Sequence, residues 1–243
     1  TFTFARNKVL EYDEAPGLRP GMKTVGRRLN TFLGYVTNGL YENYTDVEES
    51  PTSTLGNIAI SPGDIKYVDQ PDANGNYDGR ITSDDRVEIG DPWIPEIVYG
   101  FGPSMRWKNW DFSFFFQGQT NVSLIMENFE PFGERSARGV LAWIADDYWS
   151  PDYPNVNAKH PRLTRLTNNH NMQVSTYWLR DASFLKLKNV ELGYSYKKAR
   201  FYISGSNLLT ISPFKHWDPE VGTGAGMQYP TQRIFNLGIQ MSF

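Results

Sequence analysis

The last nine residues of the chain, Phe235 to Phe243, alternate between apolar and polar or small side chains and end on an aromatic residue. Because successive side chains of a β-strand point to opposite faces, this segment would present one apolar and one polar face. Such a strand is typical of an outer-membrane β-barrel, whose outer surface meets lipid. In a barrel, a terminal strand of this kind also closes the wall. The feature therefore favours a membrane barrel over a soluble enzyme.

The average composition conceals this signal. Mean hydropathy is −0.51, and no apolar run approaches the roughly 18 residues of a membrane helix. Alternating strands cancel in any average, so each one gives only a weak signal. The net charge of −3 offers no basic patch for nucleic acid, and the absence of cysteine suits passage through an oxidising periplasm. No signal peptide opens the chain, so we expect it to begin inside a larger protein.

Alternation recurs in six segments: residues 1–12, 98–107, 110–120, 183–196, 200–209 and 233–243. Each has about 10 to 14 residues, against the roughly 9–11 that a tilted strand needs to cross the bilayer core. In the fourth segment the apolar positions change parity near Lys188 and Asn189, which predicts a β-bulge. The fold class predicted is all-β and antiparallel.

Short and long connections alternate between these segments. Lys108-Asn109 leaves room for a two-residue turn, with Asn109 able to take a positive φ, and a second short turn lies between Tyr196 and Arg200. The other connections are long: residues 13–97, 121–182 and 210–232. Outer-membrane barrels have short periplasmic turns and longer extracellular loops, so we expect a periplasmic C-terminus. The alternative is a soluble β-sandwich with uneven loops.

Several stretches resemble the C-terminal part of SusC/RagA-type TonB-dependent outer-membrane transporters of Bacteroidota. They occur in family order over almost the whole chain: Ala5–Val9, Pro62–Tyr67, Asp85–Gly90, Tyr148–Asp152, His160–Leu163, Tyr177–Asn189, Ser206–Thr210 and the terminal Phe243. The resemblance implies that residues 1–243 form about the last six strands of a 22-stranded barrel. It also implies that the plug domain, the earlier strands and the TonB-contacting segment belong to a part outside this chain.

The same resemblance implies a function. A transporter of this type would be a multi-pass protein in the outer membrane of a Gram-negative bacterium, surrounded by outer-membrane lipid. It would import oligosaccharides or peptides, with a SusD-like surface lipoprotein as its lid and the TonB complex as its energy source. Chain segments of this kind supply wall and external loops, so no catalytic residue and no required cofactor is expected.

One loop has the spacing of a calcium site. Its oxygen-bearing residues follow the pattern of a calcium-binding loop: Asn74, Asn76, Asp78, Thr82 and Asp85, with the backbone carbonyl of Arg80. Gly79 falls at the sharp turn in the sixth position. Calcium, a hard cation that takes six to eight oxygen ligands, is the one candidate cofactor.

The loop also departs from the usual pattern. Asn74 stands where aspartate is usual and Asp85 where a bidentate glutamate is usual, although Asp69 and Asp72 just upstream could add charge. With so few carboxylates we expect a dissociation constant of roughly 10⁻⁴–10⁻³ M, as in extracellular modules. The alternative is an Asx- and Gly-rich turn that satisfies its own backbone.

Other residues give weaker signals. Trp143, Tyr148 and Trp149 in the second long loop could stack on sugar rings, or could simply pack that loop. The three histidines have no ligand spacing, and His160 is interpreted as loop scaffold. The pair Asp146-Asp147 is interpreted as solvated rather than catalytic.

A second functional hypothesis is a soluble, calcium-stabilised carbohydrate-binding β-module. It predicts a chain that is monodisperse in water and binds glycan unaided. The transporter hypothesis predicts a chain that aggregates without detergent, because one face of each strand is apolar and the sheet edges are unpaired.

Overall fold

The structure, a computed structural model, describes residues 1–127 and 139–242. The chain divides into two compact units. The sheet unit comprises Thr1–Arg6, Asp91–Leu124 and Arg180–Phe243, and the loop unit comprises Asn7–Gly90 and Ile125–Leu179. Phe243, predicted to end the closing strand, lies outside the described residues.

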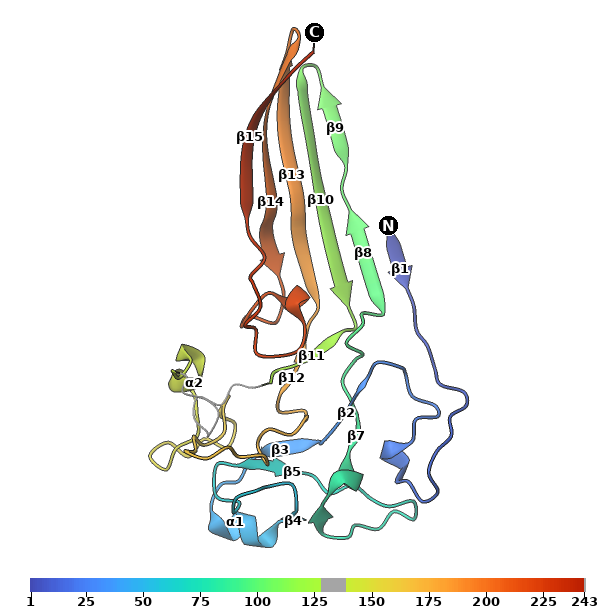
Figure 1. Cartoon of the computed structure of the whole chain (residues 1–243), viewed down its shortest axis with the longest axis vertical. Coiled ribbons are helices and arrows are strands. Elements are labelled where there is room, and N and C mark those ends of the chain that lie inside the picture. The colour runs from blue at the N-terminus through green and yellow to red at the C-terminus, as the bar shows by residue number, and fades with distance from the viewer. Residues whose placement is uncertain (128–138, 243) are drawn as a thin grey trace. The chain divides into compact units, whose positions relative to one another are not determined.

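The sheet unit is built on one antiparallel seven-stranded sheet (Figure 1). Its strands are β1 (Phe2–Phe4), β8 (Ile97–Phe101), β9 (Ser104–Trp107), β10 (Trp110–Thr120), β13 (Phe184–Tyr196), β14 (Ala199–Ile211) and β15 (Ile234–Met241). The pairing order is β1-β8-β10-β13-β14-β15, and β9 pairs with β10. Within the described residues the sheet is open at both edges. The predicted antiparallel all-β class is confirmed.

Two-residue turns join β9 to β10 and β13 to β14 at the same end of the sheet. Lys108 and Asn109 form the first turn, and Lys197 and Lys198 form the second. The positive φ lies at the first residue of each turn, Lys108 (54°) and Lys197 (53°), and not at Asn109. The reason is that both turn types favoured in two-residue hairpins need a positive φ at their first central residue.

The first predicted strand, residues 1–12, is much shorter in the structure. Only Phe2–Phe4 pairs with β8, and the ladder ends where the Ala5 N–H donates to the Glu96 carbonyl at 2.8 Å. From residue 7 onward the chain belongs to the loop unit. The alternation of the sequence here does not distinguish a strand from an extended loop.

The second predicted strand, residues 98–107, is divided into β8 and β9 at Gly102 and Pro103. Proline has no N–H to donate to a ladder, which explains the interruption. The predicted bulge is confirmed. The register of β13 against both neighbours skips Lys188, between Leu187 and Asn189.

The two faces of the sheet differ sharply in chemistry. Directly paired residues on one face form two apolar rows: Trp107, Trp110, Tyr194, Phe201 and Ile239, then Met105, Phe112, Leu192, Ile203 and Leu237. The matching rows of the opposite face are Arg106, Asp111, Gly193, Tyr202 and Gly238, then Ser104, Ser113, Glu191, Ser204 and Asn236. The apolar rows are not covered: Leu237 is 85% exposed.

An ion cluster crosses three strands on the polar face. The guanidinium of Arg200 on β14 passes over Gly193 of β13 and donates from Nε to Asp111 Oδ1 on β10 at 3.0 Å. Its Nη2 also donates to Glu191 Oε1 at 2.6 Å. A Cβ at Gly193 would lie 2.5 Å from Nη2, so only glycine leaves the path open.

Aromatic rings fill the space above two other glycines. A Cβ built on Gly118 would lie 2.3 Å from the ring of Tyr99 on the neighbouring strand, and one on Gly238 would lie 2.4 Å from the ring of Tyr202. In each pair the ring lies over the glycine of the directly paired strand, which helps to fix the register.

The third long connection is tied to the sheet by charge. Lys186 on β13 is buried, and its ammonium donates to Asp218 Oδ2 at 2.6 Å and to Glu220 Oε2 at 2.5 Å. Lys188 also donates to Glu220, at 2.6 Å. Asp218 in turn caps the short 3-10 helix Pro219–Val221.

The loop unit contains short elements held by long-range contacts. These are β2 (Phe32–Gly34) with β7 (Val87–Ile89), β3 (Thr37–Leu40) with β5 (Ile65–Tyr67), β4 (Thr52–Ser53) with β6 (Arg80–Ile81), the helices α1 (Tyr44–Glu49) and α2 (Ala142–Asp146), and the 3-10 helices Pro20–Met22 and Ser83–Asp85. β11 (Ser123–Ile125) pairs with β12 (Leu179–Asp181). In the described part of the chain, the helices are all too short or too polar to cross a membrane.

Candidate functional site

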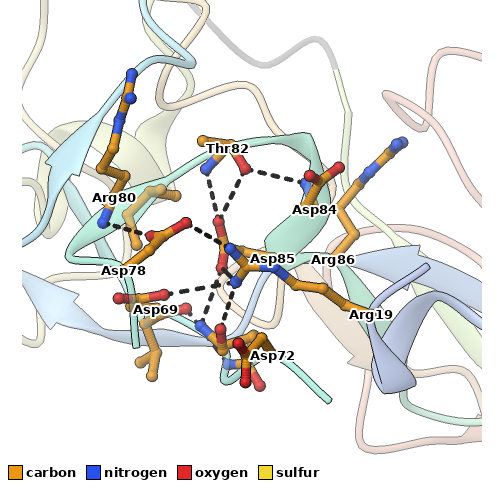
Figure 2. Close-up of polar contacts among 12 residues, drawn as sticks. Arg19, Asp69, Asp72, Asp78, Arg80, Thr82, Asp84, Asp85 and Arg86 are labelled. Atoms are coloured by element: carbon orange, nitrogen blue, oxygen red, sulfur yellow. Dashed lines mark hydrogen bonds and ion pairs between the residues drawn. The ribbon is translucent and has the colours of Figure 1, made fainter. Parts of the chain in front are cut away.

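The predicted calcium loop carries a cluster of three aspartates around one arginine (Figure 2). Arg19, which precedes the first 3-10 helix, donates from Nη2 to Asp78 Oδ2 at 2.6 Å and from Nη1 to Asp85 Oδ1 at 2.7 Å. Nη1 also donates to the backbone carbonyl of Gln70 and lies 3.7 Å from Asp69 Oδ1. A guanidinium with its fork of donors therefore fills the centre of the cluster.

Asp85 is fully buried and accepts hydrogen bonds on both oxygens. Its Oδ2 accepts from the Thr82 N–H at 2.7 Å and from the Thr82 hydroxyl at 3.3 Å. The Thr82 hydroxyl oxygen in turn accepts from the Asp84 N–H at 3.2 Å, and Thr82 and Asp85 form a capping box at the start of the second 3-10 helix. Asp85 Oδ1 accepts from the Gln70 N–H at 3.0 Å as well as from Arg19. The Thr82 side chain thus positions Asp85 and caps the helix.

Asn74 and Asn76, two of the predicted ligands, are tied to a different residue. Their backbone N–H groups donate to Asp72 Oδ1 at 2.8 and 2.9 Å, and both side chains are exposed. These hydrogen bonds close residues 70–77 into a local loop between Asp69 and Asp78. Of the predicted ligands, the structure brings Asp78, Thr82 and Asp85 together. Arg80 is exposed, and its N–H donates to Asp78 Oδ1 at 2.9 Å.

Asp69 completes the cluster and has an unusual environment. Its Oδ2 accepts from the Gly79 N–H at 2.8 Å, whereas its Oδ1 is buried and has no hydrogen-bond partner among the described residues. Burial raises the pKa of Asp69, and the neighbouring charges of Asp85 and Asp78 raise it further. The spacing of the loop suggested Asp69 only as an auxiliary. Nothing in the sequence pointed to Arg19, because 50 residues or more separate it from its partners.

Calcium binding by this loop stays a prediction. Among the described residues, no three or more histidine, cysteine, aspartate or glutamate side chains are arranged to hold a metal ion. The observed cluster instead joins three carboxylates through an arginine.

A second polar centre joins the first and second long loops. Asp64 is completely buried, and its carboxylate accepts two hydrogen bonds from Arg162, at 2.7 and 3.0 Å. The side-chain amides of Asn168 and Asn171 both donate to Asp64 Oδ1 at 2.9 Å. Asp64 and Arg162 lie in two of the stretches that carry the family resemblance, so these stretches meet in space and hold the loops in place.

The predicted substrate-stacking residues lie in different environments. Trp149 is only 7% exposed and packs on Gly63, where a Cβ would lie 2.3 Å from the indole ring. Trp143 is half-buried and meets His160 edge-on, and Tyr148 is exposed. Tyr148 therefore offers the most open ring of the three, and the stacking role stays a prediction.

His160 is part of the loop scaffold, as expected. It is buried, its Nδ1 hydrogen-bonds the Pro161 carbonyl at 2.8 Å, and its ring meets Trp178 edge-on. Burial lowers the pKa of His160 to about 4. The imidazole is therefore neutral at physiological pH.

Comparison with known proteins finds that the chain is similar to TonB-dependent receptors. It is 28% identical to "TonB-dependent receptor P3" of Formosa agariphila, with 100% of the chain matched, and 27% identical to "TonB-dependent receptor SusC" of Bacteroides thetaiotaomicron, with 87% matched. The chain spans 26% and 20% of the length of these relatives. No protein-family model matches it.

Solved structures show the same fold. The structure titled "RagAB peptide transporter" matches 90% of the chain with a TM-score of 0.65 and 25% identity, and the match covers 23% of that protein. The "open-open" state of the RagAB peptide importer matches 88% of the chain with a TM-score of 0.62 and 22% identity, over 22% of its own length. The open sheet thus corresponds to part of a transporter barrel.

Proposed function

From its similarity to TonB-dependent receptors, including SusC and the RagAB transporter, we propose that the chain belongs to the SusC/RagA type and supplies wall and outer loops to a β-barrel that imports nutrients across the outer membrane. One observation carries this proposal: eight of the ten residues in the two apolar rows that cross β9, β10, β13, β14 and β15 are exposed, as on the lipid-facing surface of a barrel. The polar rows of the opposite face then line the lumen. No reaction is assigned to this chain.

The topology supports a direction for this wall. Both two-residue turns lie at one end of the sheet, which is the periplasmic end in outer-membrane barrels. The chain is then the C-terminal portion of the receptor. Its connections 13–97, 121–182 and 210–232 are extracellular loops, and its C-terminus is periplasmic.

The cargo proposed is an oligosaccharide or a peptide, taken up with a SusD-like lipoprotein and powered by the TonB complex. The support is the similarity to SusC and to the RagAB peptide importer. No observation favours the soluble carbohydrate-binding module. Its surface would have to leave both apolar rows in water, at a cost that grows with their area.

A matched pair of labels tests the lipid-facing surface. The chain contains no cysteine, so single cysteines can be placed at the neighbouring positions Ile203 and Ser204 of the intact receptor in membranes. A spin label at Ile203 should be reached by oxygen dissolved in lipid, and one at Ser204 by a water-soluble nickel complex. A label at Ile203 that only the nickel complex reaches would overturn the proposal.

Sidedness and cargo need separate experiments. An impermeant maleimide on whole cells should label Tyr77→Cys in the first long loop, and should label Lys197→Cys only after the outer membrane is permeabilised. Cells that lack the receptor, or TonB, should lose uptake of labelled oligosaccharides or of labelled peptides. Unchanged uptake of both would contradict the proposed cargo without affecting the placement of the wall.

A further inference from the structure

The position of Arg19 Nη1 already has the surroundings of a bound cation. Three oxygens from three residues face it: the Gln70 carbonyl, Asp85 Oδ1 at 2.7 Å and Asp69 Oδ1 at 3.7 Å. Asp78 approaches the same guanidinium from the side, through Nη2. Carbonyl and carboxylate oxygens are the ligands that hard divalent cations prefer.

The cluster carries more negative than positive charge. Three carboxylates face one guanidinium, and two of them, Asp69 and Asp85, are at least nine-tenths buried. Buried carboxylates need a partner for each negative charge. The single positive charge of Arg19 therefore does not balance the three carboxylates of the cluster. Asp69 Oδ1 points to the same deficit: it is buried, accepts no hydrogen bond from the described residues, and lies 3.7 Å from Arg19 Nη1, which is too far for a hydrogen bond.

The backbone also places Asp69 in the role of the first ligand of a calcium loop. Its Oδ2 is held by the N–H of Gly79, whose φ of +71° makes the sharp turn that follows Asp78. The excursion from residue 70 to residue 77 is closed on itself by the hydrogen bonds of Asp72. Asp69 therefore stands next to Asp78 in space, and Asn74 does not take the first position that its spacing suggested.

We propose that Asp69, Asp78 and Asp85, with the carbonyl of Gln70, form a calcium site in which the ion exchanges with the guanidinium of Arg19. Calcium takes six to eight oxygens at roughly 2.3–2.6 Å, so the carboxylates close in on the ion and water completes its shell. Arg19 turns outward when the ion enters. In calcium-poor medium Arg19 returns, so the loop keeps its fold without metal.

Competition with the guanidinium of Arg19 determines how tightly calcium binds. Because calcium must displace a paired guanidinium, its dissociation constant falls in the range of roughly 10⁻⁴–10⁻³ M, suited to the outside of a cell. This inference is independent of the import function, because the ion binds to a loop of the purified receptor whether or not cargo is present.

The test is calorimetric titration of calcium into the intact receptor in detergent, with terbium luminescence as a second readout. The Arg19→Met variant should bind calcium at least about tenfold more tightly, because it lacks the competing positive charge. The Asp69→Asn variant should bind calcium at least about tenfold more weakly, because an amide oxygen carries no negative charge. Asn74→Ala is the matched control and should leave the affinity unchanged.

Each result supports or contradicts the proposal. Binding that is lost in Asn74→Ala but kept in Asp69→Asn would overturn the proposed ligand set. No heat from the parent protein or from Arg19→Met up to about 10 mM calcium would overturn the site, since extracellular calcium sites bind below that level. If Arg19→Met unfolds the loop, the comparison of Asp69→Asn with Asn74→Ala in the parent background decides alone.

Discussion

The sheet unit and the loop unit distribute the same residue types in opposite ways. In the sheet, large apolar side chains such as Leu237, Phe235 and Ile239 are among the most exposed residues. In the loop unit, Tyr41, Ile65 and Ile81 are almost completely buried, together with the charged residues Asp64 and Asp85. The sheet is thus organised for an apolar surrounding and the loop unit for water. One chain can therefore be folded for two solvents.

The largest expected effect is in the polar centre of the loop unit. Asp64→Ala leaves Arg162 and two buried amides without their shared acceptor. The free energy of unfolding of the loop unit should fall by about 3–5 kcal/mol, as for a broken buried ion pair. Hydrogen exchange should show lost protection in residues 7–90, 125–127 and 139–179, with the sheet unit unchanged. Asp152→Ala, an exposed site in the same unit, is the control, and equal protection in both variants would contradict the prediction.

A second change tests the sheet. Leu237→Arg introduces a charge into an apolar row and should destabilise the barrel by about 2–4 kcal/mol if the site is near the bilayer midplane. The amount of heat-modifiable, folded receptor in outer membranes measures the effect. Asn236→Arg, one residue away on the polar face, should fold normally. If both variants fail equally, the two faces do not differ in their surroundings.

The stability of the loop unit, unlike that of the sheet unit, should depend on pH through a buried histidine, His160. The pKa of His160 is about 4 in the folded state against a reference of 6.5, so the unfolded chain binds a proton first as the pH falls. The contribution of His160 is fully present above pH 6.5 and declines toward pH 4, by about 3 kcal/mol in total. Chemical unfolding of the loop unit followed across this range should show the decline.

Two variants check the assignment of that decline. His160→Gln should make the slope shallower but not remove it, because burial also lowers the pKa of His170. His216→Gln changes an exposed side chain of the sheet unit and should leave the slope as it was. A slope that His160→Gln does not alter would show that other groups cause it.

The smallest effect concerns packing within the sheet. Gly118→Ala places a methyl group about where the ring of Tyr99 lies, since a Cβ there would be 2.3 Å from it. The ring must move, and we expect a loss of about 1–3 kcal/mol, as for other overpacked sites. Thermal unfolding of the purified receptor measures it. Tyr99→Ala combined with Gly118→Ala should recover part of the loss, and no recovery would contradict a steric cause.

Sequence patterns predicted the sheet far better than the loop unit. Alternation located β10, β13, β14 and β15 to within a few residues, and a change of parity located the bulge at Lys188. These are local features, since side-chain direction in a strand depends only on position along it. The first strand was overestimated because an extended loop can alternate as well.

The loop unit depends on contacts that no local pattern contains. Arg162 meets Asp64 across 98 residues, and Arg19 meets Asp85 across 66. The calcium spacing was counted along the chain, whereas the structure loops out residues 70–77 and brings Asp69 beside Asp78. Only the three-dimensional structure shows which of the oxygen-bearing side chains that fit the sequence pattern lie close together.

The two short turns have a consequence for how deeply the protein lies in its membrane. Each turn begins with a lysine whose ammonium lies over the aromatic ring just before it: Lys108 over Trp107 at 5.0 Å and Lys197 over Tyr196 at 5.4 Å. Trp and Tyr rings are enriched at the membrane–water interface, and lysine side chains lie along apolar surface while their ammonium groups reach the lipid headgroups. In the proposed barrel, this end of the sheet would be held at the headgroup level of the membrane. Strands that are lengthened or shortened would then shift the opposite end of the sheet relative to the membrane.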